Sequence, residues 1–208
     1  MKIIILCNAE CTMSKSFSSP LTFKGEKYAV KLADILKKKS IDRIYCSPFL
    51  NSMLTIYPFC SANNKKIKIE PAFQDIQQGI NKNGNMLYFN SIYDNLSNPK
   101  YEFLNKIVNE YYQSQVLINN ILLYEERQDV INRLNPVLYS IIEKYKTTDY
   151  NILIVTHKTI IDAIKEFFDK RALHIQKIIR KQNSNADINY EVEYISGQAD
   201  ALGDSVFN

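Results

Sequence analysis

The sequence has 208 residues and a mass of 24.2 kDa, a size that suits one domain with its own hydrophobic core. Hydrophobic residues make up 46% of the chain and charged residues 23%, which is ordinary for a globular protein and excludes a low-complexity chain. The net charge of +4 is too small to indicate nucleic acid binding, and no apolar run approaches the roughly 20 residues that cross a bilayer.

Short apolar segments alternate with amphipathic ones in the first third of the chain. The β-branched run at residues 2–8 predicts a buried parallel strand, and residues 25–39 have apolar side chains near helical spacing. Residues 42–47 predict a second strand. Residues 48–62 open on a proline, which favours the first turn of a helix. Residues 67–70 predict a third strand.

The middle of the chain is less regular. Residues 78–98 are rich in Asn and Gly, which is typical of an irregular surface segment. Residues 101–123 and 128–146 both predict helices, and Pro136 is expected to kink the second of them. We interpret residues 80–124 as an insertion or lid segment within a single domain that covers residues 1–208.

In the last third of the chain, predicted strands again alternate with predicted helices. The run NILIVT at residues 151–156 predicts a strand, residues 157–169 a helix, and residues 189–195 a further strand of the edge type. Residues 198–208 are small and polar, so we expect them to fray. Strands that alternate with helices predict an α/β fold with a mostly parallel sheet covered on both faces.

Ligands of parallel α/β sheets bind beyond the carboxyl ends of the strands. Three segments follow directly after predicted strands, namely residues 7–10, 46–51 and 156–158. We therefore expect the functional residues to come from these segments.

The four cysteines, Cys7, Cys11, Cys46 and Cys60, match no common zinc-binding spacing and are too few for a disulfide scaffold. The opening apolar run is also too short for a signal peptide. We expect reduced thiols, no metal site and a cytoplasmic protein.

Five short stretches occur in order along the chain: IILCNAE at 4–10, SPLTFKG at 19–25, SPFLNSMLT at 47–55, FQDIQQG at 73–79 and VTHK at 155–158. Their order and content resemble the motifs of the histidine phosphatase (phosphoglycerate mutase-like) superfamily, over roughly residues 2–195. The resemblance implies a three-layer α/β/α sandwich with a mostly parallel central sheet. It also implies phosphatase or phosphomutase activity on a phosphate ester.

The chain departs from the family at the reacting positions. Asn8 stands where the resemblance places the nucleophilic histidine. Cys7 and Asn51 stand where it places two phosphate-binding arginines. The shorter Asp75 stands for the glutamate that acts as the acid, and His157 alone keeps the family residue. The sequence therefore resembles a catalytically degenerate member.

The chemistry of these replacements argues against phosphoryl transfer. A carboxamide nitrogen gives its lone pair to its carbonyl group, so Asn8 can form hydrogen bonds but cannot attack phosphorus. Without two guanidinium groups, the charge of the transferring group is not neutralised. A thiol nucleophile at Cys7 is not indicated, because no Cys-x5-Arg pattern follows it.

The same positions can still bind a ligand. We take Cys7, Asn8, Asn51, His157 and Lys158 as candidate ligand-binding residues, with no catalytic residue assigned. His157 at a predicted helix start favours an anion, and Lys158 supplies a positive charge beside it. A histidine held only by local hydrogen bonds explains the pattern equally well.

Two hypotheses follow. The first is a pseudophosphatase that binds a phosphate-containing small molecule or a protein partner without catalysis. The alternative is a phosphohydrolase with altered catalytic residues, in which His157, Asp75 and an activated water act on a phosphomonoester. The alternative needs a metal ion or new cations near the pocket, and the sequence plainly offers only Lys158. We expect no cofactor, no nucleic acid partner and no membrane association, and the oligomeric state stays open.

Overall fold

A computed structural model describes residues 1–12, 17–76, 96–117, 121, 124–182 and 190–197, with the side chains of residues 173–182 excepted. Five strands form one sheet in the order β3-β2-β4-β1-β5, and every neighbouring pair is parallel. The strands are β1 (Lys2–Cys7), β2 (Ile41–Cys46), β3 (Ile67–Ile69), β4 (Asn151–Thr156) and β5 (Glu191–Ile195).

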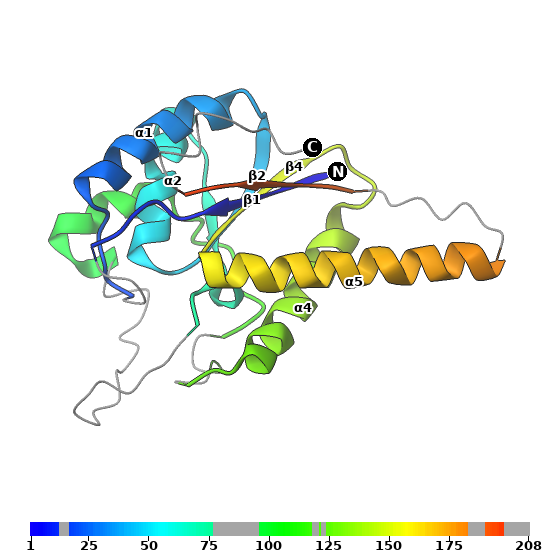
Figure 1. Ribbon diagram of the computed structural model, residues 1–208. Helices are drawn as coiled ribbons and strands as arrows, with labels where there is room; N and C mark the ends of the chain where they lie inside the picture. Colours follow the sequence, from blue (N-terminus) through cyan, green and yellow to red (C-terminus); the bar gives the residue numbers. More distant parts are fainter. Residues whose placement is uncertain (13–16, 77–95, 118–120, 122–123, 183–189, 198–208) are drawn as a thin grey trace.

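Helices cover both faces of this sheet (Figure 1). Helices α1 (Phe23–Lys37) and α2 (Leu50–Ala62) lie on one face, and α4 (Arg127–Tyr145) and α5 (Lys158–Gln182) lie on the other. Two 3-10 helices, η1 (Pro71–Phe73) and η2 (Pro99–Ile107), complete the described elements. The arrangement is the three-layer α/β/α sandwich that the sequence predicts.

Strand β1 shows why the sequences of the central strands are continuously apolar. Ile4 and Leu6 face the layer of α1 and α2, whereas Ile3 and Ile5 face α4 and α5, and all four are fully buried. Burial of each such side chain contributes roughly 1.5–3 kcal/mol, so a central strand of a two-sided sheet needs apolar residues at every position.

Helix α1 is tied to the loop after β1 at its first turn. The Thr22 hydroxyl oxygen accepts a hydrogen bond from the Gly25 amide at 3.1 Å, which caps the helix. The same hydroxyl donates to the Glu10 carboxylate at 2.8 Å. Gly25 packs against the Glu10 backbone so closely that a β-carbon there would overlap the Glu10 carbonyl oxygen. These contacts fix the loop that carries Asn8.

The prediction of a helix over residues 101–123 is wrong. The chain forms the 3-10 helix η2 and then leaves it, because the Asn109 amide donates to the Ile67 carbonyl at 2.9 Å, beside the edge of β3. Leu104 and Ile107 of η2 pack under α2, where Phe103 meets Tyr57 at 4.6 Å between ring centroids. The described part of the segment 80–124 is therefore joined to the main core.

Other predictions changed in extent. Helix α5 continues to Gln182, well beyond the predicted end at residue 169, and α4 runs unbroken across Pro136. Strand β5 is an edge strand, as predicted. Most of the predicted irregular segment 78–98 and all of the predicted frayed end 198–208 lie outside the described residues. Within the described ranges, no helix is both long and apolar enough to cross a membrane.

Candidate functional site at the carboxyl ends of the strands

Three neighbouring strands end together at one edge of the sheet. The Asn8 amide donates to the Thr156 carbonyl at 2.8 Å, which joins the end of β1 to the end of β4. The Ser47 amide donates to the Val155 carbonyl at 2.9 Å, which joins β2 to β4. The residues that follow these strands, including Asn8 and His157, therefore lie together at this edge of the sheet.

His157 lies at the centre of this edge and is 4% exposed. Its Nε2 forms a hydrogen bond with the Ser47 hydroxyl at 2.8 Å, and the Ser52 hydroxyl lies 3.4 Å from the same atom. The Phe49 ring packs edge-on against the imidazole at 4.8 Å between centroids. The side chain is thus held on three sides by α2 and the turn that leads into it.

The surroundings of His157 keep its ring uncharged. Burial lowers the pKa of His157 to about 4, an effect that the nearby Asp75 carboxylate opposes and the Arg133 guanidinium reinforces. At neutral pH the ring is therefore a neutral hydrogen-bonding group, and it brings no positive charge to an anion.

Asn8 and Cys7 lie at the end of β1 and are both half-buried. The Asn8 side-chain amide donates to the Ala9 carbonyl at 2.9 Å. Burial raises the pKa of the Cys7 thiol to about 11, although a hydrogen bond from the Gly197 backbone and the charge of Lys158 oppose that effect. Cys7 is therefore a thiol and not a thiolate at neutral pH, which agrees with the expectation that it is not a nucleophile.

Asn51 lies in the first turn of α2 and is 2% exposed. Its side-chain oxygen accepts a hydrogen bond from the Ser52 hydroxyl at 3.3 Å. Since Ser52 also approaches His157, an uncharged network connects the two candidate residues. Thr55, one turn further along α2, hydrogen-bonds the Ala9 amide at 2.9 Å and so fixes the loop after β1 against α2.

Asp75 follows η1 and is 8% exposed. Its Oδ1 accepts hydrogen bonds from the Ile76 amide at 2.8 Å and from the Thr159 hydroxyl in the first turn of α5. The charge of Asp75 affects the titration of both His157 and Cys7, so the carboxylate belongs to the same site.

A buried ion pair, which the sequence analysis did not predict, holds the backbone just before Asp75. Arg133 of α4 contacts Glu125 through Nε at 2.5 Å and through Nη2 at 3.1 Å, and the two side chains are 7% and 1% exposed. Arg133 also donates to the carbonyls of Ala72 and Gln74, on either side of Phe73. The ion pair thereby fixes the backbone that leads into the site.

The signal for Arg133 was present in the sequence. The residue stands on the apolar face of the helix that also carries Val130, Leu134 and Val137, and a buried arginine on such a face requires a carboxylate partner. Ser47 and Ser52 gave no comparable signal, because serines are common in turns and helix starts.

Lys158, the first residue of α5, is exposed, and its charge lowers the Cys7 pKa. All five candidate ligand-binding residues thus lie at one edge of the sheet, together with Asp75. Among the residues that the structure describes, no three His, Cys, Asp or Glu side chains form a group that could hold a metal ion.

Comparison with solved structures gives the class of fold. The YhfR protein of Bacillus stearothermophilus is 17% identical, with 82% of this chain and 81% of that chain covered and a TM-score of 0.54. The ecdysone phosphate phosphatase of Bombix mori, solved with tungstate, is 16% identical with a TM-score of 0.53. That match covers 73% of this chain but only 58% of the Bombix chain.

A mycobacterial glucosyl-3-phosphoglycerate phosphatase, solved with VO3, is 15% identical, with 77% of this chain and 78% of that chain covered and a TM-score of 0.51. At such identities these likenesses support a phosphoglycerate mutase-like α/β sandwich and nothing finer. No curated protein matches the sequence.

The sequence itself matches the profile of the histidine phosphatase superfamily (branch 1) over residues 6–202. Since the match covers nearly the whole chain, the protein belongs to this superfamily.

Proposed function

We propose that this chain is a non-catalytic member of its superfamily, a pseudophosphatase that acts by binding. The observation that carries the proposal is that the side chains at the reacting positions of the strand-end site are uncharged. His157 is an uncharged ring held by serine hydroxyls, and the positions beside it carry the amides of Asn8 and Asn51.

The residue at the position of the family's nucleophile, Asn8, supports this proposal. Asn8 lies at the end of β1, and its amide nitrogen donates to the Ala9 carbonyl. That nitrogen has no free lone pair, so it cannot accept a phosphoryl group. The Cys7 thiol beside it is protonated at neutral pH, because its pKa lies near 11.

The charge of the site supports it as well. A transferring phosphoryl group needs cations around its oxygens, and loss of one such donor costs roughly 3–4 kcal/mol in the transition state. Arg133 is engaged with Glu125 and two backbone carbonyls, so its charge is already compensated. Lys158 remains exposed at the start of α5, while Asp75 adds a negative charge.

The groups of the site that can still attract an anion favour weak binding of a phosphate group over catalytic turnover. Lys158 and the first amides of the long helix α5 attract a phosphate group, since a helix N-terminus carries a partial positive charge. We therefore propose a phosphate-containing small molecule, or a protein partner that presents such a group, as the ligand of the strand-end site.

The alternative is a phosphohydrolase with altered catalytic residues. The observation that favours it is the proximity of the Asp75 carboxylate to His157, because an acid and a neutral imidazole in one site can activate a water molecule. This mechanism requires His157, so it makes a different prediction about substitution there.

Hydrolysis of 4-nitrophenyl phosphate and of a panel of phosphomonoesters distinguishes the two proposals. We expect the unmodified protein to show no turnover above background, and His157→Ala to change nothing. The triple variant Cys7→Arg/Asn8→His/Asn51→Arg, which restores the family residues, should gain measurable activity if the surrounding fold is intact. Turnover by the unmodified protein that disappears in His157→Ala would establish the alternative.

A further inference from the structure

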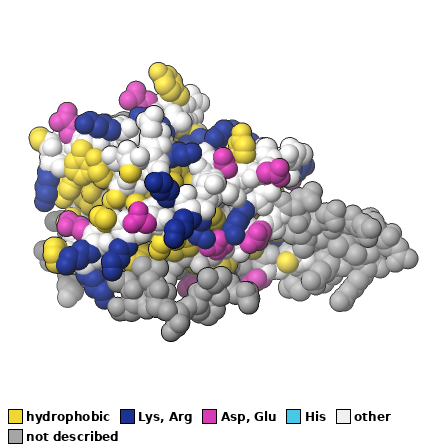
Figure 2. All heavy atoms as spheres, turned by 90° about the horizontal axis from the view of Figure 1, so that it is seen from above, with side chains coloured by type: hydrophobic (Ala, Val, Ile, Leu, Met, Phe, Trp, Pro, Cys, Tyr) yellow, Lys and Arg dark blue, Asp and Glu magenta, His cyan; other side chains and the backbone are white. Residues whose placement is uncertain are grey.

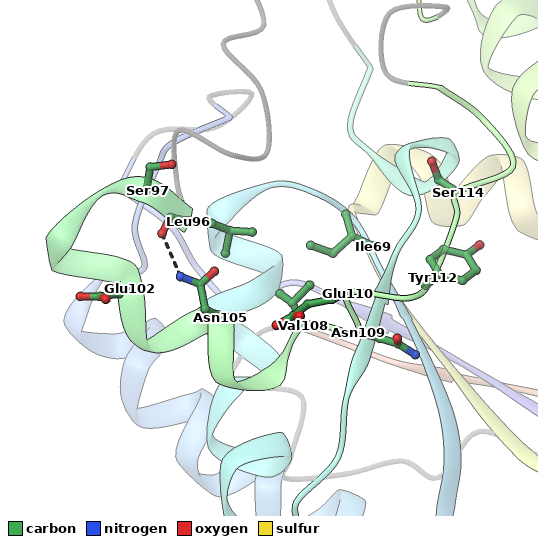
Figure 3. Close-up of a pocket in the computed structure, with 10 residues that line it drawn as sticks. All are labelled: Ile69, Leu96, Ser97, Glu102, Asn105, Val108, Asn109, Glu110, Tyr112 and Ser114. Carbon is green, nitrogen blue, oxygen red and sulfur yellow. Dashed lines mark hydrogen bonds between the residues drawn. The ribbon is translucent and has the colours of Figure 1, made fainter.

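A pocket lies at the edge of the sheet, apart from the strand-end site. It has a volume of about 610 Å³ and lies between β3 and the chain on either side of η2 (Figure 3). Its volume is within the usual range for small-molecule sites, roughly 300–1,000 Å³. The described residues that line it include neither the five candidate ligand-binding residues of the strand-end site nor Asp75.

Apolar side chains form much of the pocket wall. Ile69 of β3, Leu96 and Val108 line it, together with the ring of Tyr112. The Tyr112 hydroxyl donates to the buried Glu70 carboxylate at 2.6 Å, which fixes the ring in place. This wall is therefore formed before any ligand arrives, so binding does not have to order it.

The edge of β3 adds a polar backbone group to this wall. The Glu70 amide donates to the Cys46 carbonyl of β2, so by the alternation of a β-strand the Ile69 amide and carbonyl point away from β2. Asn109 pairs with Ile67, but the chain then turns, with the Tyr112 amide donating to the Asn109 carbonyl at 3.2 Å. The described chain thus leaves the outer edge of Ile69 open.

The Glu110 carboxylate gives the pocket a negative charge. In Figure 3 Glu110 extends toward Val108, whereas the Glu102 carboxylate on η2 points away from the other lining residues. No lysine or arginine is among the described residues that line the pocket, although the chain as a whole has a net charge of +4. This charge attracts a cation and repels a phosphate group.

We propose that this pocket binds an organic cation with an apolar body, such as an arylalkylammonium ion. The ammonium group forms an ion pair with Glu110 and a hydrogen bond with the Ile69 carbonyl. The apolar body packs against Leu96, Val108 and the Tyr112 ring.

The test uses the full chain and three probes of the same shape. Binding of 2-phenylethylamine, 2-phenylethanol and 3-phenylpropionate is followed by NMR of isotope-labelled protein. The amine should bind more tightly than the alcohol, and the carboxylate should not bind. The perturbed signals should be those of Ile69, Leu96 and Val108.

Charge variants locate the interaction. Glu110→Gln should weaken amine binding about fivefold, the upper end of what an exposed ion pair contributes. Glu26→Gln, which makes the same change at an exposed site on α1, should leave the affinity unchanged. The proposal is wrong if the amine does not bind at 20 mM, if the alcohol binds equally well, or if Glu110→Gln has no effect.

Discussion

At the scale of single residues, the strand-end site is defined by a buried histidine that is hydrogen-bonded to a serine hydroxyl. The Ser47 hydroxyl is hydrogen-bonded to Nε2 of His157 at 2.8 Å, and the Phe49 ring shields one side of the imidazole from water. Such an environment stabilises the neutral ring over the imidazolium ion. This preference has a direct consequence for titration.

The first prediction concerns this titration. The chain has two histidines, His157 and His174, so their ring signals in an NMR pH series can be assigned with one variant, His174→Gln. We expect His157 to stay neutral down to about pH 4. A His157 signal that titrates near its ordinary value of 6.5 would show that the ring is not buried as described.

The same shift makes stability depend on pH. Between pH 6.5 and about 4 the unfolded chain protonates His157 and the folded protein does not, so acidification favours unfolding. The loss approaches about 3 kcal/mol at pH 4, from about 1.4 kcal/mol for each pH unit. Urea unfolding at pH 7 and pH 5 should show a smaller loss in His157→Gln than in the unmodified protein.

A further prediction at the residue scale concerns the ion pair of Arg133 and Glu125. Arg133→Met leaves the Glu125 carboxylate buried without its partner, which should cost about 3–5 kcal/mol in the free energy of unfolding. The double variant Arg133→Met/Glu125→Leu should recover part of that loss but not all, because the bonds to Ala72 and Gln74 stay broken. A double variant that is less stable than Arg133→Met would contradict this account.

At the scale of elements, the end of β5 is packed over the end of β1. The Tyr28 hydroxyl of α1 donates to the Ser196 carbonyl. A β-carbon added to the next residue, Gly197, would overlap the Asn8 carbonyl oxygen. The backbone after β5 thus forms one wall of the strand-end site.

This packing predicts the effect of Gly197→Ala. The added methyl group must push the end of β5 away from β1, and such overpacking costs roughly 1–3 kcal/mol. Ser196→Ala, which keeps the backbone carbonyl that Tyr28 contacts, is the matched control and should be close to neutral. Thermal unfolding measures both. Equal melting temperatures for Gly197→Ala and the unmodified protein would rule out the close approach.

The elements differ in how far the sequence could predict them. Strands β1 and β4 were predicted because their apolar, β-branched runs are buried on both faces, a pattern that surface segments do not imitate. The helix predicted at residues 101–123 failed because Leu104 and Ile107 are spaced by three, which suits a 3-10 helix as well as an α-helix.

Tertiary contacts then decided the path of the next residues. The Glu70 carboxylate accepts hydrogen bonds from the amides of Gln115 and Val116, which holds that segment in a non-helical path. A local sequence pattern cannot predict a hydrogen bond between residues that are more than forty positions apart in the chain. The candidate site was predictable for a different reason, because strand ends of a parallel sheet meet at one edge.

At the scale of the whole molecule, the chain has a net charge of +4. Figure 2 shows basic and acidic side chains interspersed over one face. The two candidate sites differ in charge: the strand-end site has both Lys158 and Asp75, whereas Glu110 lines the pocket beside β3 and no described lysine or arginine does. The same fold thus offers different ligand chemistry at these two places.

The central claim is that no side chain of the strand-end site accepts a phosphoryl group. Mass spectrometry of the intact protein after single-turnover incubation with 4-nitrophenyl phosphate, quenched under conditions that preserve phosphohistidine, tests it directly. We predict no phosphorylated protein in the unmodified chain, and a phosphorylated fraction in Cys7→Arg/Asn8→His/Asn51→Arg. A phosphoryl group on the unmodified protein, mapped to Cys7, Asn8 or His157, would contradict the account.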